Sequence, residues 1–353
     1  MHHDFMDSRY HYDLPPALIA SRPASPRDAA RLLVFDAASG AVSFDRFLNI
    51  DKYLPQDSLL VLNDTKVAPA RAMLRKETGG NVEVLFLLNE WDGKGPIPAL
   101  VDRKVAVGAM LDFGEKKKVE VIGQEENIFY LKPHFQPAEI FEILDRRGVT
   151  PIPKYIKNTG LPESVLRKRY QSIFGKKFAS VAAPTASLHF TDRVIAKLEK
   201  QGMRKTFVTL HVGLGTFAPV SERQLAAHEL HREFLTISAA SATAIREQKR
   251  AKKPVVAVGT TVVRALESQA GKIMKPASKP ISAETRIFIK PPHDFKIVDA
   301  LVTNFHLPGT SLMMLVQAFL ENKKAKRSVA GLYRIAIKEK FRFYSFGDTM
   351  LVK

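Results

Sequence analysis

Three segments of the chain each combine one histidine with an absence of acidic and basic side chains. They run over residues 178–191, 206–221 and 300–320 and carry His189, His211 and His306, respectively. In a chain whose residues are 25% charged, such segments predict the walls of a buried pocket. A neutral histidine in such a wall can act as a general base. For any one of them alone, a histidine that only makes a hydrogen bond in the core is the alternative.

A glycine-containing turn follows an expected strand over residues 206–212. The sequence HVGLGTF places Gly213 and Gly215 before Thr216. Glycines allow a ligand to approach backbone amides closely, so this turn is a candidate ligand-binding loop. It lacks the third glycine of a dinucleotide-binding fingerprint, and no acidic residue at the end of a second strand completes one. The turn therefore does not by itself identify a nucleotide.

A second turn lies in the sequence VVAVGTTVVRALES from Val255, which predicts a strand, a tight turn and a helix. Gly259, Thr260 and Thr261 would stand at the start of that helix, where backbone amides and hydroxyls bind anions. Arg264 lies one turn further along. The alternative is that Thr260 only caps the helix.

The sequence Asn63-Asp64-Thr65-Lys66 ends an expected strand over residues 59–62. Ligands of α/β sheets bind at the ends of such strands, so the Asp64 carboxylate is a candidate to bind a hydroxyl group or to act as a base. An Asx turn that leads into the next segment is the alternative.

Basic and aromatic residues alternate between positions 154 and 177. This combination suits the phosphates and stacked bases of single-stranded RNA, and a solvated basic face is the alternative for the lysines. The candidate RNA-binding residues are Lys154, Tyr155, Arg167, Lys168, Arg169, Tyr170, Lys176 and Lys177.

The charge of the chain is confined to one region. The 353 residues carry a formal net charge of +18, but residues 1–150 hold 19 basic and 22 acidic side chains, whereas residues 151–353 hold 35 basic and 14 acidic ones. An excess confined to one region predicts a surface that meets a polyanion such as nucleic acid.

The chain contains no cysteine, which excludes disulfides, thiolate metal sites and a cysteine nucleophile and favours a reducing cytosol. The N-terminus lacks the apolar core of a secretory signal, and the longest uncharged segment is interrupted by polar residues, glycine and proline. We therefore expect a cytoplasmic protein without a membrane span, and a monomer is the default expectation.

Two parts of the chain differ in their residue pattern. Residues 67–150 alternate short β-branched runs with glycine turns, which predicts an inserted small antiparallel β-barrel. Residues 1–66 and 151–353 are predicted to form one α/β domain with a mixed sheet built from discontinuous segments. We expect strands over 31–35, 58–62, 81–88, 99–107, 118–122, 128–132, 206–212, 255–258, 286–289 and 298–302. We expect helices over 14–21 with Asp13 as N-cap, 192–200 with Thr191 as N-cap, 239–249, 262–269, 311–320 and 328–340.

Taken together, these segments resemble the S-adenosylmethionine:tRNA ribosyltransferase-isomerase family of queuosine biosynthesis. The similarity covers nearly the whole chain in eight ordered motifs. They are YDLPPALIASRPASPRDAARLLV from Tyr12, LLVLNDTKVAPAR from Leu59, TGGNVEVLFL from Thr78, SVAAPTASLHFT from Ser180, FVTLHVGLGTFAPV from Phe207, VAVGTTVVRALES from Val256, IVDALVTNFHLPGTSLMMLV from Ile297 and FRFYSFGDTMLV from Phe341.

The resemblance implies a large discontinuous α/β domain with an inserted β-barrel. It also implies transfer of the ribosyl portion of S-adenosylmethionine to 7-aminomethyl-7-deazaguanine at the wobble position of tRNA. Isomerisation would then give epoxyqueuosine, with release of adenine and methionine. S-adenosylmethionine is the implied cosubstrate, and no metal or redox cofactor is implied.

Such a reaction needs a base at the ribose C5′, a donor to the departing adenine, a site for the methionine carboxylate and an acceptor for the proton of the aminomethyl group. The candidates are His211 or His306 as base, Arg264 with Thr260 and Thr261 on the carboxylate, Asp64 on the ribose hydroxyls, and Glu233 or Asp348 for the amine. Further candidate cosubstrate-binding residues are Gly213, Gly215, Thr216, Gly259 and Asn304.

The chain departs from the family pattern at a few places. Lys154 replaces a proline before Tyr155, Leu230 replaces a methionine before His231, and the segment over residues 283–295 lacks two glycines and a tyrosine. Two other classes of protein are alternatives. An RNA methyltransferase should show a glycine-rich loop after its first strand, and a non-catalytic RNA-binding protein does not account for the histidine-bearing segments.

Overall fold

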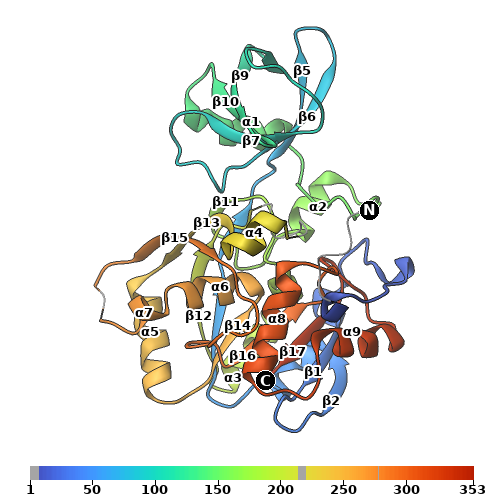
Figure 1. The fold of residues 1–353 in the computed structure, drawn as a ribbon, viewed down its shortest axis with the longest axis vertical. Coiled ribbons are helices and arrows are strands. Elements are labelled where there is room, and N and C mark those ends of the chain that lie inside the picture. Colours follow the sequence, from blue (N-terminus) through green and yellow to red (C-terminus); the bar gives the residue numbers. More distant parts are fainter. Residues whose placement is uncertain (1–7, 214–219, 277) are drawn as a thin grey trace.

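The computed structural model describes residues 8–213, 220–276 and 278–353. A nine-stranded mixed sheet forms the larger part of the protein, and a six-stranded closed barrel stands beside it (Figure 1). In spatial order the strands of the sheet are β15 (Ile281–Ile287), β13 (Glu229–Ile237), β12 (Arg204–Leu210), β3 (Leu59–Asn63), β14 (Val255–Val258), β16 (Ala300–Asn304), β17 (Thr349–Val352), β1 (Arg31–Phe35) and β2 (Val42–Arg46). The predicted fold class is confirmed.

The centre of the sheet is parallel and buried on both faces. Strands β12, β3, β14 and β16 pair in parallel, whereas β17 runs antiparallel to β16 and parallel to β1. Every residue of β3, β14 and β16 is buried. This explains why these strands are almost continuous apolar runs in the sequence.

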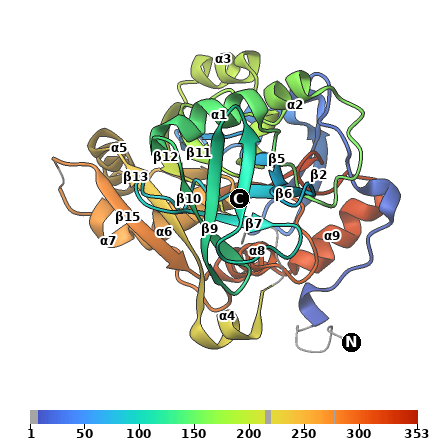
Figure 2. The same cartoon turned by 90° about the horizontal axis from the view of Figure 1, so that it is seen from above.

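Helices cover both faces of the sheet (Figure 2). One face packs against α5 (Ala239–Arg250), α6 (Thr260–Ser268), α7 (Ala270–Ile273), α8 (Ser311–Asn322) and α9 (Val329–Lys338). The other face packs against α3 (Asp192–Lys200) and the 3₁₀ helices η4 (Phe47–Lys52) and η6 (Thr185–His189). Alternate strand residues serve the two cores, since Leu59 and Val61 face the first and Leu60 and Leu62 the second. None of the described helices combines the length and apolar character needed to cross a membrane.

The predicted antiparallel barrel is present. Its strands follow one another in the order β10 (Ile128–Pro133), β7 (Ile97–Val101), β6 (Asn81–Phe86), β5 (Arg71–Lys76), β8 (Met110–Gly114) and β9 (Lys117–Glu125). Helix α1 (Ile140–Arg147) follows them and contributes Ile140, Ile143 and Leu144 to the barrel core. The exact domain boundaries, 67–150 for the insertion, stay a prediction.

Several short elements complete the structure. They are β4 (Thr65–Val67), β11 (Lys177–Ser180), α2 (Glu163–Arg169), α4 (Glu222–Ala227), and the 3₁₀ helices η1 (Ser8–Tyr10), η2 (Pro16–Leu18), η3 (Arg27–Ala29) and η5 (Pro137–Glu139). Strands β4 and β11 pair in parallel next to the barrel. The chain therefore leaves and re-enters the α/β part at neighbouring positions.

Some expected elements are confirmed and others differ from the structure. Thr191 caps α3 as predicted, since its Oγ1 accepts the amide of Val194 at 3.4 Å. The helix expected after Asp13 is wrong: only η2 forms, because Pro15 is extended (φ −57°, ψ 128°), as a residue before proline prefers. The strand expected over 286–289 begins five residues earlier as β15. Strands β2, β4, β5, β8, β11, β13 and β17 were not predicted.

Candidate active site

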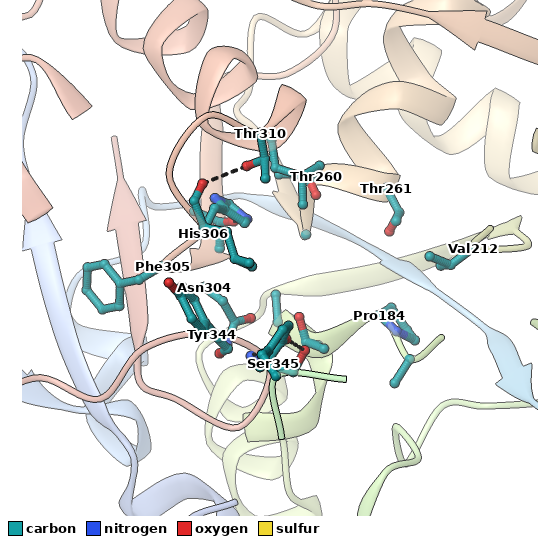
Figure 3. A pocket seen from close by; sticks show the side chains of 18 residues that line it. Pro184, Val212, Thr260, Thr261, Asn304, Phe305, His306, Thr310, Tyr344 and Ser345 are labelled. Atoms are coloured by element: carbon teal, nitrogen blue, oxygen red, sulfur yellow. Dashed lines mark hydrogen bonds between the residues drawn. The ribbon is translucent and has the colours of Figure 1, made fainter. Parts of the chain in front are cut away.

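A pocket opens at the carboxyl ends of β14 and β16 (Figure 3). It holds about 550 Å³ of empty space including its open mouth. Its walls come mainly from residues 183–186, 259–261, 303–307 and 344–345, together with Tyr155 and Val212. All three uncharged segments therefore reach one pocket, although His306 is the only one of their histidines that lines it among the described residues.

The turn before α6 brings two hydroxyl groups to the pocket. Gly259 has a φ of 97°, which residues other than glycine rarely adopt. This conformation lets the chain pass from β14 directly into the helix. Thr260 and Thr261 are the first helical residues, and both are buried in the pocket wall. A helix N-terminus with two hydroxyls suits an anionic group such as a carboxylate.

Asn63 joins the strand ends around the pocket. Its Nδ2 donates to the carbonyl of Leu210 at 2.9 Å and lies 3.4 Å from Thr261 Oγ1, while its Oδ1 accepts the amide of Leu210 at 3.1 Å. The neighbouring Asp64 does not line the pocket, and its Oδ1 accepts the Thr209 hydroxyl at 2.6 Å. Asn63, and not the predicted Asp64, is thus the residue of this turn that contacts the pocket wall.

His306 is held in one orientation. Its Nδ1 lies 3.1 Å from the Tyr333 hydroxyl oxygen, which also accepts the backbone amide of His306 at 3.1 Å, and its Nε2 lies 3.3 Å from Thr303 Oγ1. Because the Tyr333 hydroxyl hydrogen is then available to Nδ1, these partners favour the neutral tautomer with its hydrogen on Nε2. Burial lowers the pKa of His306 to about 3, so the ring is neutral at pH 7.

Asn304 lies beside His306 with one unused acceptor. Its Nδ2 donates to the carbonyl of Tyr344 at 3.2 Å and lies 3.4 Å from His189 Nε2. Its Oδ1 is buried and has no hydrogen-bond partner among the described residues. Tyr344 has a φ of 70°, a strained conformation for a bulky residue, which is often found at ligand sites.

Asp348 and His189 lie behind the pocket wall. Asp348 accepts the backbone amides of Arg31 at 2.9 Å and Arg342 at 2.8 Å, and Arg342 Nη2 at 3.2 Å. These donors occupy both carboxylate oxygens, so Asp348 does not fit the predicted role of proton acceptor for the amine. Burial lowers the pKa of His189 to about 4, while Asp348 opposes that shift.

Arg264 and Glu233 form a buried ion pair. Their side chains are 6% and 3% exposed. Glu233 Oε1 also accepts the Gly213 amide at 3.4 Å. Burial raises the pKa of Glu233, and Arg264 opposes that shift. Nε and Nη2 of Arg264 have no hydrogen-bond partner among the described residues. The sequence predicts separate roles for these two residues and does not predict their ion pair.

The structure describes the glycine-containing turn after β12 only as far as Gly213. His211 is half-buried with its Nδ1 2.8 Å from Thr65 Oγ1, and burial lowers its pKa while Asp64 opposes the shift. Gly215 and Thr216 lie outside the described residues. Gly213 lines a second cavity described below.

The predicted RNA-binding residues divide into two groups. Lys154, Lys168, Lys176 and Lys177 are exposed, and Arg169 is half-exposed. Tyr170, however, is completely buried with its ring 5.6 Å from that of Phe346, so it is not available to stack on a base. Arg167 is held by Glu163 at 3.0 Å and Asp145 at 3.1 Å and links α2 to the end of α1. These two predictions are therefore corrected.

A second cavity lies between the barrel and the α/β part and shares Tyr155 with the first pocket. It holds about 1,130 Å³ including its open mouth, and its walls include Leu85, Leu100 and Ile128 of the barrel. The Tyr155 hydroxyl lies 2.5 Å from Ser345 Oγ of the first pocket. Among the described residues, no group of three or more histidine, aspartate or glutamate side chains is arranged to hold a metal ion.

Comparisons with known proteins decide the family. A family model described as "Queuosine biosynthesis protein" matches residues 7–352. The chain belongs to this family. Relatives named S-adenosylmethionine:tRNA ribosyltransferase-isomerase include one from Caldanaerobacter subterraneus, 40% identical over 98% of this chain and 99% of its own length, and one from Thermotoga maritima, 42% identical over the same shares.

A solved structure of the queuosine biosynthesis family supports the fold. The crystal structure titled S-adenosylmethionine tRNA ribosyltransferase from Thermotoga maritima is similar with a TM-score of 0.54 and 34% identity, over 98% of this chain and all of that one. The expected enzyme class, a transferase of queuosine biosynthesis, is confirmed. Membership of this family also argues against the methyltransferase and the non-catalytic RNA-binding protein.

Proposed function

We propose that this enzyme transfers the ribosyl portion of S-adenosylmethionine to 7-aminomethyl-7-deazaguanine at the tRNA wobble position and isomerises it to epoxyqueuosine, releasing adenine and methionine. The observation that carries the proposal is the pair of adjoining cavities that share Tyr155. A reaction that joins a small cosubstrate to one base of a large RNA needs two such compartments. The names of the relatives support the same pair of substrates.

We place S-adenosylmethionine in the first pocket. Thr260, Thr261 and the N-terminus of α6 would bind the methionine carboxylate. Arg264, whose Nε and Nη2 have no hydrogen-bond partner among the described residues, lies one helical turn further along. Asn304 Oδ1 is an acceptor without a partner in the same pocket, and it suits the exocyclic amine of adenine.

The two histidines suit different roles. His306 is neutral and presents Nε2–H beside Thr303, so we assign it as a hydrogen-bond donor to the departing adenine and no longer as the base. His211 remains the candidate base at the ribose C5′. It is next to Val212 of the pocket wall, and its lowered pKa keeps it neutral at pH 7.

Glu233 is the candidate acceptor for the proton of the aminomethyl group. Its pKa is raised by burial, which makes a carboxylate a better base. Gly213, whose amide it accepts, also lines the second cavity, so Glu233 lies close to the boundary between the two compartments.

The tRNA is proposed to meet the exposed lysines Lys154, Lys168, Lys176 and Lys177. We expect the logarithm of the tRNA affinity to fall linearly with the logarithm of salt concentration, because each phosphate contact releases counterions. Lys168→Ala and Lys176→Ala should each reduce the slope by about 1, as measured by filter binding between about 50 and 200 mM salt. Lys94→Ala, at an exposed barrel turn, is the control. A slope that is flat, or that neither variant changes, would remove this surface from the proposal.

The reaction is tested by incubating the full-length protein with S-adenosylmethionine and tRNA that carries 7-aminomethyl-7-deazaguanine. We expect free adenine and a ribosyl-derived gain in the mass of the wobble nucleoside. A methyl-sized gain would indicate a methyltransferase, and absence of any product despite tRNA binding would contradict the proposed reaction. The absence of a metal requirement and a cytoplasmic location belong to the same proposal, and metal independence is checked by repeating the assay with a chelator.

A further inference from the structure

We infer that the cavity under the barrel binds the flipped-out wobble base itself, and that Glu90 accepts hydrogen bonds from the ring N–H and the exocyclic amine of its guanine-type edge. This inference rests on the proposed function, since it names the part of the RNA that occupies the second cavity. It assigns a specificity-determining role to a residue of the barrel that no sequence motif indicated.

The cavity has the lining expected for an unstacked base. Its walls are mostly apolar, with Leu85, Leu87 and Leu100 from the barrel and the proline-rich segment over residues 151–153 opposite. Tyr155 stands where this cavity meets the first pocket. Proteins that read single-stranded RNA hold an unstacked base between apolar or aromatic surfaces and read its edge with a few polar groups.

Glu90 is the single acidic side chain among the described residues that line this cavity. It lies in the β6–β7 connection, where its amide donates to the carbonyl of Leu87 at 2.9 Å. No described cation lies within ion-pair distance of its carboxylate. Burial raises the pKa of Glu90, while Arg232 and the neighbouring Asn89 amide oppose the shift. The carboxylate is thus partly desolvated and lacks a strong partner of its own.

The position of Glu90 is fixed by close contact with the glycine turn of the α/β part. A Cβ atom on Gly213 would lie 2.9 Å from Asn89 Nδ2 and 3.7 Å from Glu90 Oε1. Asn89 is 1% exposed, and its two amide atoms make no hydrogen bond of normal geometry with a described residue. Asn89 therefore lies behind Glu90, and a substrate edge in the cavity would contact the Glu90 carboxylate, which lines it.

The charges in the cavity favour a neutral edge over a cation as the partner of Glu90. Arg71 and Lys154 line the same cavity, so the protonated aminomethyl group would meet further positive charge there. The edge of a guanine-type base is neutral and offers two parallel N–H donors, a geometry that a carboxylate accepts in a bidentate manner. The aminomethyl group can then lie toward Glu233 and the first pocket.

The test measures binding, so it does not depend on turnover. Fluorescent anticodon stem-loop RNAs are prepared with 7-aminomethyl-7-deazaguanine at the wobble position, with the same base lacking its 2-amino group, and with unmodified guanine. We expect the full-length protein to bind the first RNA at least about 10-fold more tightly than the RNA without the 2-amino group, since a bidentate pair discriminates by about 5- to 150-fold. Glu90→Gln should reduce this preference to about 2-fold or less.

Matched variants complete the test. Glu77→Gln, in the exposed β5–β6 turn, should keep the full preference, and Glu90→Asp should keep part of it. The inference is overturned if Glu90→Gln keeps the preference for the 2-amino group, or if it loses only the preference for the aminomethyl group over unmodified guanine. A protein that shows the Glu90-dependent preference but releases no adenine would contradict the proposed reaction and leave this inference standing.

Discussion

Replacing His306 by glutamine is expected to lower adenine release by about 10²- to 10³-fold, the usual effect of losing a positioned hydrogen-bond donor to the charge that develops in the transition state. The affinity for S-adenosylmethionine should change by less than about 3-fold, because glutamine keeps an uncharged hydrogen-bonding side chain in the pocket. Rapid-quench measurement of the first turnover gives the rate of adenine release, and calorimetric titration gives the affinity. The two readouts separate loss of chemistry from loss of binding.

Two further variants test the orientation of the ring. Tyr333→Phe removes the hydroxyl that lies 3.1 Å from His306 Nδ1, so we expect a smaller loss of rate, because either tautomer becomes available. His134→Gln, on the barrel surface, should behave like the parent protein. If His306→Gln releases adenine at the parental rate, His306 is not the donor to adenine.

Replacing Glu233 by glutamine is expected to lower the free energy of unfolding by about 3 to 5 kcal/mol, because Arg264 would keep a buried charge without its partner. Arg264→Met should cost less. A glutamate whose pKa is already raised by burial can take up a proton and become neutral, whereas arginine stays charged. Urea denaturation followed by circular dichroism measures both values.

The double variant Glu233→Leu with Arg264→Met separates stability from function. It should regain most of the lost stability, since replacing both members of a buried pair by apolar residues is often neutral. If Arg264 binds the methionine carboxylate, this folded variant should still bind S-adenosylmethionine at least 10-fold more weakly than the parent protein. A Glu233→Gln variant as stable as the parent would show that the pair is solvated or not formed in solution.

The sequence was informative wherever a local rule determines structure. Residues 255–268 give a buried strand, a glycine with positive φ and a helix N-terminus, and each of these follows from neighbouring residues alone. The absence of charge in three distant segments also indicated a shared pocket, because a buried wall excludes charged side chains wherever it occurs in the chain. The strands β3, β14 and β16 were predicted for the same reason.

Local sequence rules could not predict contacts between distant segments. Nothing near Tyr170 shows that it is completely buried against Phe346, and nothing near Arg264 shows that Glu233 neutralises it. The edge-side strands β13 and β15 carry many polar residues and lack a clear apolar period, which is why β13 was not predicted and only the end of β15 was. Glu90 gave no signal because its environment comes from the α/β part.

The order of strands also affects how the chain matures on the ribosome. Strands β1 and β2 join the sheet only through β17, and Arg31 and Asp348, which share a 2.9 Å hydrogen bond, lie 317 positions apart. A two-stranded hairpin is marginally stable by itself. The first hairpin to be synthesised must therefore wait, with Leu33 and Val34 uncovered, until the roughly 300 residues between β2 and β17 have left the exit tunnel, and during this interval its apolar side chains are open to a chaperone.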